Sequence, residues 1–170
     1  MRISNKMEKA TMEAHIMDTK QVLQILNQAL QIEYAAGIQY LQHSFLVQGI
    51  DRRVFADYFR SQSESSFNQA KQIGDHIVNL GGLPTVEPYA IKQSTDLKEM
   101  LQLNLELERT GLKVYQEGIK AAAEDTPLKF FFEDQAYHEY QDVNELEKLL
   151  DQKKVSVTEK EVQLKKVKSA

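Results

Sequence analysis

The sequence predicts an all-α fold, a four-helix bundle with one long crossover between its second and third helices. Apolar residues recur at steps of three and four in four separate segments, which is the period of a helix with one buried side. Only seven of 170 residues are glycine and three are proline, too few for the many turns of a β-sandwich or barrel. Residues 83–95 hold two prolines and no helical period, so they predict the crossover.

Capping and stop signals place the ends of the helices. Asp18 or Thr19 can cap the first helix, and the second stops at Gly81 and Gly82, with Pro84 directly beyond. The expected helices cover about residues 19–48, 52–80, 96–123 and 127–150. Two hairpins joined by one long connection favour the single-crossover topology over an up-down-up-down bundle with an idle loop.

The expected organisation is one domain with two terminal segments. An extension at 1–18 precedes the bundle at 19–150, and a basic tail at 151–170 follows it. The tail is either a solvated end or a short fifth helix, since it carries only a weak apolar pattern.

Composition and charge exclude several classes of function. The chain has no cysteine, which excludes disulfides, thiolate zinc sites and iron–sulfur clusters. No run approaches the ~18–20 apolar residues of a membrane span, so we expect no membrane association. We expect a cytoplasmic location. Residues 21–150 carry eleven basic and nineteen acidic groups, and this acidic body predicts no nucleic-acid binding. Only the tail, with six basic groups, is a candidate to bind an anionic partner.

Each expected helix becomes polar at its middle, on the side that should face the core. The residues concerned are Glu33, Gln62, Ser66, Gln69, Asn104, Glu108, Gln135, His138 and Asp142. A buried carboxylate needs a metal, a proton or a hydrogen-bonding partner. The pattern therefore predicts either one site shared by the four helices or a neutral polar layer in which the glutamates hold protons.

Four segments of the sequence resemble the helices of bacterioferritins and related ferritin-like proteins. They are LNQALQIEYAAGIQYLQH at Leu26 to His43, LGGLP at Leu80 to Pro84, LELER at Leu105 to Arg109 and FFEDQAYHEY at Phe131 to Tyr140. The resemblance implies a ferritin-like bundle with two iron ions, held by one Glu from each of two helices and a Glu-x-x-His from each of the other two. Glu33 and Glu108 match the two single glutamates of that pattern.

The chain departs from the family at the remaining ligands. Ser66 and Gln69 stand at the Glu and His positions of the second helix, and Gln135 replaces the glutamate of the fourth, where His138 remains. Phe67 stands at the position of the family's haem-ligating methionine, so no haem is expected. The expected centre is one weak site for iron or another divalent metal, formed by Glu33, Glu108, His138 and Gln135.

Other candidate ligands are not expected to contribute. Glu64 and Glu139 lie off the buried stripes, and His43 is expected near a helix end or a subunit surface. The functional prediction is a self-associating, bacterioferritin-like subunit that is non-catalytic or binds metal weakly. Two alternatives stay open: an active iron oxidase or storage protein that uses Glu33, Glu108 and His138, and a helical scaffold whose tail recruits an anionic partner.

Overall fold

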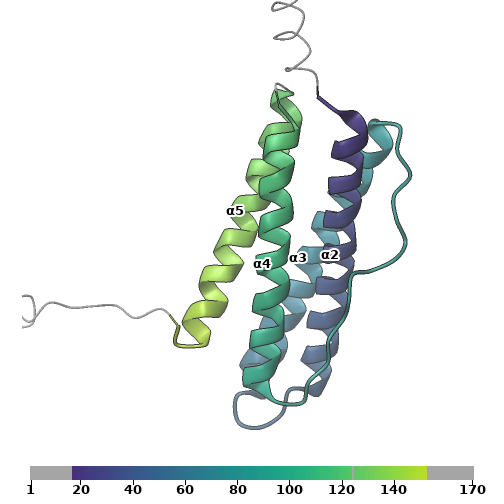
Figure 1. Ribbon diagram of the computed structural model, residues 1–170. Helices are drawn as coiled ribbons and strands as arrows, with labels where there is room; N and C mark the ends of the chain where they lie inside the picture. Colours follow the sequence, from purple (N-terminus) through teal and green to yellow (C-terminus); the bar gives the residue numbers. More distant parts are fainter. Residues whose placement is uncertain (1–16, 124, 153–170) are drawn as a thin grey trace, which may run out of the picture.

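The computed structural model describes residues 17–123 and 125–152, and it forms a bundle of four helices. These are α2 (Thr19–Leu46), α3 (Arg52–Asn79), α4 (Leu97–Ala121) and α5 (Thr126–Leu149). Figure 1 shows that the crossover returns along the bundle, so that α3 and α4 run in the same direction. The predicted all-α bundle with a single crossover is confirmed. The extension and the tail, with its alternative fifth helix, lie almost entirely outside the described residues.

Aspartate caps and glycines set the ends of the helices. Asp18, Asp96 and Asp125 each accept hydrogen bonds from backbone N–H groups in the first turn that follows, at 2.8 to 3.3 Å. Gly49 and Gly81 follow the ends of α2 and α3 and have φ angles of +89° and +78°, a conformation that favours glycine.

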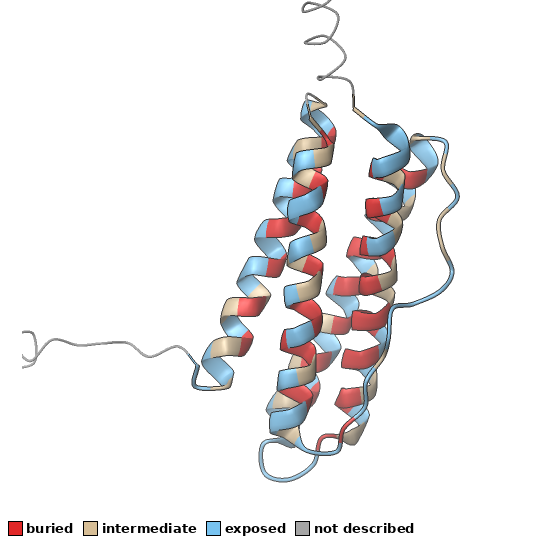
Figure 2. Cartoon of the chain, in the orientation of Figure 1, coloured by how far each residue is buried: buried red, intermediate tan, exposed pale blue. Residues whose placement is uncertain are grey.

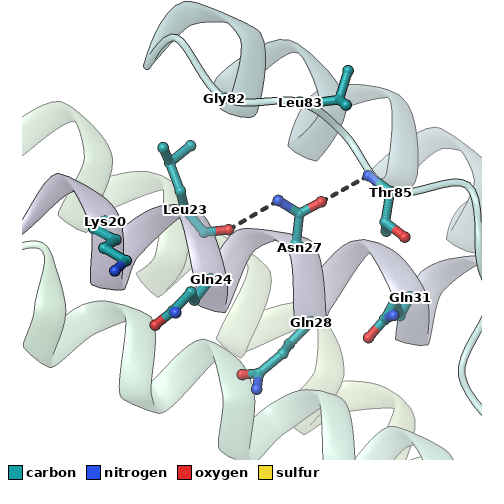
Figure 3. A pocket seen from close by; sticks show the side chains of 9 residues that line it. All are labelled: Lys20, Leu23, Gln24, Asn27, Gln28, Gln31, Gly82, Leu83 and Thr85. Atoms are coloured by element: carbon teal, nitrogen blue, oxygen red, sulfur yellow. Dashed lines mark hydrogen bonds between the residues drawn. The ribbon is translucent and has the colours of Figure 1, made fainter.

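The crossover is fastened to α2 by backbone hydrogen bonds. The N–H groups of Thr85, Tyr89 and Lys92 donate to Asn27 Oδ1, the Gln31 carbonyl and Gln39 Oε1. Figure 3 shows Asn27 between the two segments, where its amide also donates to the Leu23 carbonyl. These bonds satisfy polar groups of a segment that forms no regular structure of its own.

The core consists of two apolar clusters separated by a polar layer. One cluster includes Leu26, Leu30 and Phe132, and the other includes Phe59 and Met100. The buried polar residues between them come from all four helices: Glu33, Ser66, Gln69, Asn104, Glu108, Gln135 and Glu139. Figure 2 shows the buried side of every helix turned toward the bundle axis. The prediction that the helices become polar at one shared level is confirmed.

Candidate metal centre

Two Glu and Tyr pairs with the same spacing, one on α2 and one on α4, form the α2–α4 side of the polar layer. Glu33 precedes Tyr40 by seven residues on α2, and Glu108 precedes Tyr115 by seven on α4, so each pair spans two turns of one helix face. The helices are antiparallel, and the bonds are therefore reciprocal. Tyr115 Oη donates to Glu33 Oε1, and Tyr40 Oη donates to Glu108 Oε1, both at 2.6 Å.

A third glutamate, Glu139 of α5, lies between these pairs. It is 2% exposed, and its carboxyl group is within hydrogen-bonding reach of both Glu33 and Glu108. Gly111 of α4 makes room for it, because a Cβ at that position would come within 2.9 Å of Glu139 Oε2. We call Glu33, Glu108 and Glu139 the carboxyl cluster.

Burial raises the pKa of every member of the carboxyl cluster. The pKa of Glu33 rises from 4.5 to about 8, chiefly because burial desolvates the carboxyl group and also because of the Glu108 charge, against the opposing hydrogen bond from Tyr115. Burial also raises the pKa of Glu108 to about 6 and that of Glu139 well above the usual range. The cluster therefore retains protons at neutral pH.

The α3 helix brings neither a carboxylate nor an imidazole to the cluster. Ser66 Oγ donates back to the Gln62 carbonyl of its own helix at 3.1 Å. Gln69 Nε2 donates to Glu139 Oε1 at 3.5 Å, at the limit of a hydrogen bond. Both residues lie in the polar layer, as expected, and both act as hydrogen-bond donors there.

The placement of His138 was predicted wrongly. Its side chain is 52% exposed and lies 3.8 Å from Asp134 on the outer side of α5. The buried stripe instead runs through Phe132, Ala136, Glu139, Val143 and Leu146, at steps of four and three. The expectation that Glu139 lies off the buried side was wrong for the same reason.

Gln135 is buried, as expected, but it turns part of its amide toward α3. Its Nε2 donates to Gln72 Oε1 at 3.4 Å, while no described donor reaches its Oε1. Glu139 Oε2 likewise accepts no hydrogen bond from a described N–H or O–H group. Two buried oxygens of α5 thus remain without a donor.

His43 and Phe67 lie outside the carboxyl cluster. His43 is near the end of α2, as expected, but it is fully buried rather than at a surface, beside Phe59. Burial lowers the pKa of His43 to about 4, which keeps its imidazole neutral. The Phe67 ring packs on Gly37, where a Cβ would lie 2.8 Å from it. Glu64 is exposed, consistent with its expected place outside the site.

No group of three or more His, Asp and Glu side chains in the described part of the chain is arranged so that it could hold a metal ion. Within the same residues, no helix is both long and apolar enough to cross a membrane.

A four-helix bundle with a single crossover and carboxylates at its centre defines the ferritin-like class of folds. The ferritin-like domain family matches residues 23–155, most of the chain, and the chain belongs to this family.

Solved structures agree with this assignment. A ferritin-like, diiron-carboxylate protein from Bacillus anthracis is 33% identical, with a TM-score of 0.76 over 79% of this chain and 99% of that one. The bacterioferritin of Rhodobacter capsulatus is 27% identical, with a TM-score of 0.71 over 78% of this chain and 84% of that one. The resemblance to bacterioferritins predicted from the sequence is confirmed.

A curated relative matches over a shorter stretch. The nutrient stress-induced DNA-binding protein of Synechococcus sp. is 29% identical over 77 residues, or 45% of this chain. The match covers 44% of that relative's own length.

Proposed function

We propose that this member of the iron storage and handling superfamily is a subunit without a standard two-iron ferroxidase centre. Its carboxyl cluster holds protons in place of two metal ions and binds a divalent cation only weakly. The subunit is accordingly non-catalytic in iron oxidation.

The observation that carries this proposal is the donor set at the bundle centre. Two divalent ions require about four carboxylates, to balance their charge, and two imidazoles to complete their coordination. Three carboxylates lie here, α3 supplies none, and His138 is on the outer surface. The residues present do not fit two iron ions.

Hydrogen bonding explains how the three carboxyl groups lie together without a metal. The two tyrosine hydroxyls stabilise charge on one oxygen each of Glu33 and Glu108. A proton on Glu33 or Glu139 allows a carboxyl-to-carboxyl hydrogen bond where two ionised groups would repel one another. The cluster is thus balanced by shared protons, as a buried set of like charges requires.

A second candidate function is a single-cation site made of oxygen ligands alone. Glu139 Oε2 and Gln135 Oε1 are buried oxygens that no described donor reaches, and an oxygen without a donor is free to bind a cation. The three carboxyl groups as they stand are not arranged to hold a metal ion, so a hard cation would bind only if Glu33, Glu108 and Glu139 turned toward it as the shared protons leave. In this altered site Glu139 takes the place that the sequence analysis gave to His138.

The proposal is tested by titrating metal-stripped protein with Fe²⁺ in air and measuring bound iron and ferric absorbance. We expect no rapid oxidation and less than one tightly bound iron per chain. A bacterioferritin with a complete dinuclear site is the positive control. Two irons per chain with rapid oxidation, abolished by E33Q with E108Q, would overturn the proposal. Glu106→Gln is the matched control, because Glu106 lies on the exposed side of α4.

Terbium luminescence separates the two candidates. Tyr40 and Tyr115 contact the carboxyl cluster, so a Tb³⁺ ion bound there would be excited through them. Sensitised emission that E33Q and E139Q abolish, and E106Q does not, would favour the single-cation site. Emission that is weak and equal in all variants would favour the proton-holding cluster.

Other binding roles have less support. The DNA-binding property in the relative's name is not extended to this chain, because residues 21–150 carry an acidic excess that repels polyanions. The scaffold alternative depends on residues of the tail that are not described, and deleting 153–170 in a partner pull-down tests it. A cytoplasmic location stays a prediction.

A further inference from the structure

A buried imidazole of α2 has no hydrogen-bond partner in the part of the chain that the structure describes. It belongs to His43, which is fully buried, and neither Nδ1 nor Nε2 bonds to a described group. The Asn104 side chain on α4 and the Lys92 backbone in the crossover lie near the ring and would stabilise its protonated form. Neither of them is placed for a well-formed hydrogen bond. A buried polar group of this kind is rare and needs an explanation.

The residues around this imidazole fasten the lower part of the crossover to the bundle. The Lys92 N–H donates to Gln39 Oε1 at 2.8 Å, and Gln39 Nε2 donates to Asn104 Oδ1 at 2.9 Å. These two bonds connect the crossover, α2 and α4, and Figure 1 shows the crossover passing beside α2 on its way to α4. His43 follows Gln39 by one helical turn and so lies beside this connection. We call Gln39, His43, Lys92 and Asn104 the crossover clasp.

The surroundings of the His43 ring offer no counter-ion. Phe59 of α3 packs on the ring, with centroids 5.8 Å apart. Tyr40 and Tyr58 pack on Phe59 in turn, and both stay neutral because burial raises the pKa of each above its usual range. Apart from burial, only the neutral amide and backbone groups of the clasp affect the pKa of His43, and no charged side chain of the described residues does. A proton on His43 would therefore be a buried, uncompensated charge.

A cavity of about 150 Å³ lies between the crossover and α4, beside the clasp. Gln39 and Lys92 of the clasp line it, together with Tyr89 and Glu106. The Lys92 ammonium pairs with Glu106 at 2.8 Å, but both side chains are more than half exposed, and such pairs contribute little to stability. The buried clasp is thus the main attachment of this part of the crossover. Its release would open the cavity to water and give the imidazole access to solvent.

We propose that the crossover clasp is an acid-sensitive switch, in which protonation of His43 releases the crossover from α2 and α4. A proton adds a charge and a second N–H donor to a site where Asn104 Oδ1 already accepts from Gln39. Water can solvate the imidazolium only when the crossover moves away. None of these residues belongs to the carboxyl cluster, so this inference and the proposed function can fail independently.

The direction of the pH dependence follows from the two states of the ring. Burial lowers the pKa of His43 from 6.5 to about 4, whereas a solvated ring in the released state has its ordinary value. The released state therefore binds more protons between these values, and the clasp weakens as the pH falls below about 6.5. Between pH 7 and pH 5 the equilibrium constant for release should rise about 20-fold. The carboxyl cluster acts in the opposite direction, because burial raises the pKa of its members.

Amide hydrogen exchange of the full chain, followed by NMR, tests the switch. The protection factor of the Lys92 N–H should be constant above about pH 7 and should fall about 20-fold between pH 7 and pH 5. The Thr85 N–H, which donates to Asn27 at the upper end of the crossover, should change by less than about threefold. Protection of Lys92 that stays constant, or that rises as the pH falls, would overturn the proposal.

His43→Gln assigns the pH dependence to the imidazole. The amide does not titrate, so Lys92 protection in this variant should change by less than about twofold between pH 7 and pH 5. His138→Gln is the matched control, because the His138 side chain is 52% exposed on α5, and it should keep the parental fall. A parental fall in His43→Gln would contradict the assignment. If His43→Gln does not fold, the ring of the parent decides by NMR: titration near pH 4 supports the switch, and titration near pH 6.5 overturns it.

Discussion

The two halves of the bundle centre are built differently. Between α2 and α4, two tyrosines donate reciprocally to two buried glutamates at 2.6 Å. Between α3 and α5, amide groups donate the described side-chain hydrogen bonds: Gln62 donates to Asp142 at 2.8 Å, and Gln135 to Gln72 at 3.4 Å. The backbones of α3 and α5 also approach one another less closely than those of α2 and α4.

The difference follows the ligand pattern that the resemblance to bacterioferritins implies. The α2–α4 half has the two glutamates that match the family pattern, each with its own hydrogen-bond donor. The α3–α5 half has neutral Ser66, Gln69 and Gln135 where the resemblance implies the other ligands, and its one fully buried carboxyl group among the described residues is Glu139. We therefore expect substitutions to cost more in the α2–α4 half than in the α3–α5 half.

The largest expected effect is a loss of stability with rising pH. The pKa of Glu33 is about 8 in the folded protein and near 4.5 when unfolded, so the folded state binds more protons between these values. The contribution of Glu33 to the free energy of unfolding is therefore greatest below about pH 4.5. It falls as the pH rises through about 8. We expect metal-free protein to lose about 2–4 kcal/mol between pH 5 and 9 in urea titrations.

Glu33→Gln should make this dependence shallower, because its amide stays neutral across the range while Glu108 and Glu139 still titrate. Glu106→Gln, at an exposed position, should keep the slope of the parent. Equal slopes in all three proteins would contradict the raised pKa of Glu33.

Removing one tyrosine donor should have the next largest effect. Tyr115→Phe leaves Glu33 without its shortest hydrogen bond and should lower the free energy of unfolding by about 1–3 kcal/mol. Tyr137→Phe, on the exposed side of α5, should change it by less than about 0.5 kcal/mol. Chemical denaturation at pH 7 measures both, and similar values for the two would remove the special role of Tyr115.

Filling the space beside Glu139 should have a smaller effect. Gly111→Ala places a methyl group 2.9 Å from Glu139 Oε2, closer than an ordinary van der Waals contact, and we expect a loss of about 1–2 kcal/mol. Gly74→Ala is the control, because a Cβ at Gly74 meets open space. It should raise stability by about 0.5–1 kcal/mol through helix propensity alone. Stabilisation by both substitutions would show that Glu139 moves away without cost.

The smallest effect is expected in the α3–α5 half. Gln62→Leu removes the hydrogen bond to Asp142, which is partly exposed to water, and should cost less than about 1 kcal/mol. The same denaturation experiment measures it. A loss as large as that of Tyr115→Phe would show that the two halves contribute equally.

Much of this architecture could be predicted from the sequence. We could predict the helices from the helix period, the Asp18 cap and the glycines after α2 and α3. The polar interruptions at Glu33 and Glu108 predicted the position of the shared polar layer. These signals are local, because period and capping act within one helix.

The side of α5 that faces the core was predicted less well than those of the other helices. Two stripes are possible there, one through Gln135 and His138 and one through Ala136 and Glu139, and the steps of three and four were assigned to the first. In its middle the second stripe has apolar Ala136 and Val143 where the first has His138 and Asp142, and hydrophobic burial turns that side inward. The reciprocal tyrosine bonds were also missed, since they depend on the relative height of two antiparallel helices.

The central claim is that the carboxyl cluster holds protons at neutral pH, and infrared spectroscopy of metal-free protein tests it most directly. The difference spectrum between the parent and Glu33→Gln at pH 7 should contain the C=O band of a protonated carboxyl group, and this band should disappear above about pH 9. A spectrum with only ionised carboxylate bands at pH 7 would contradict the account.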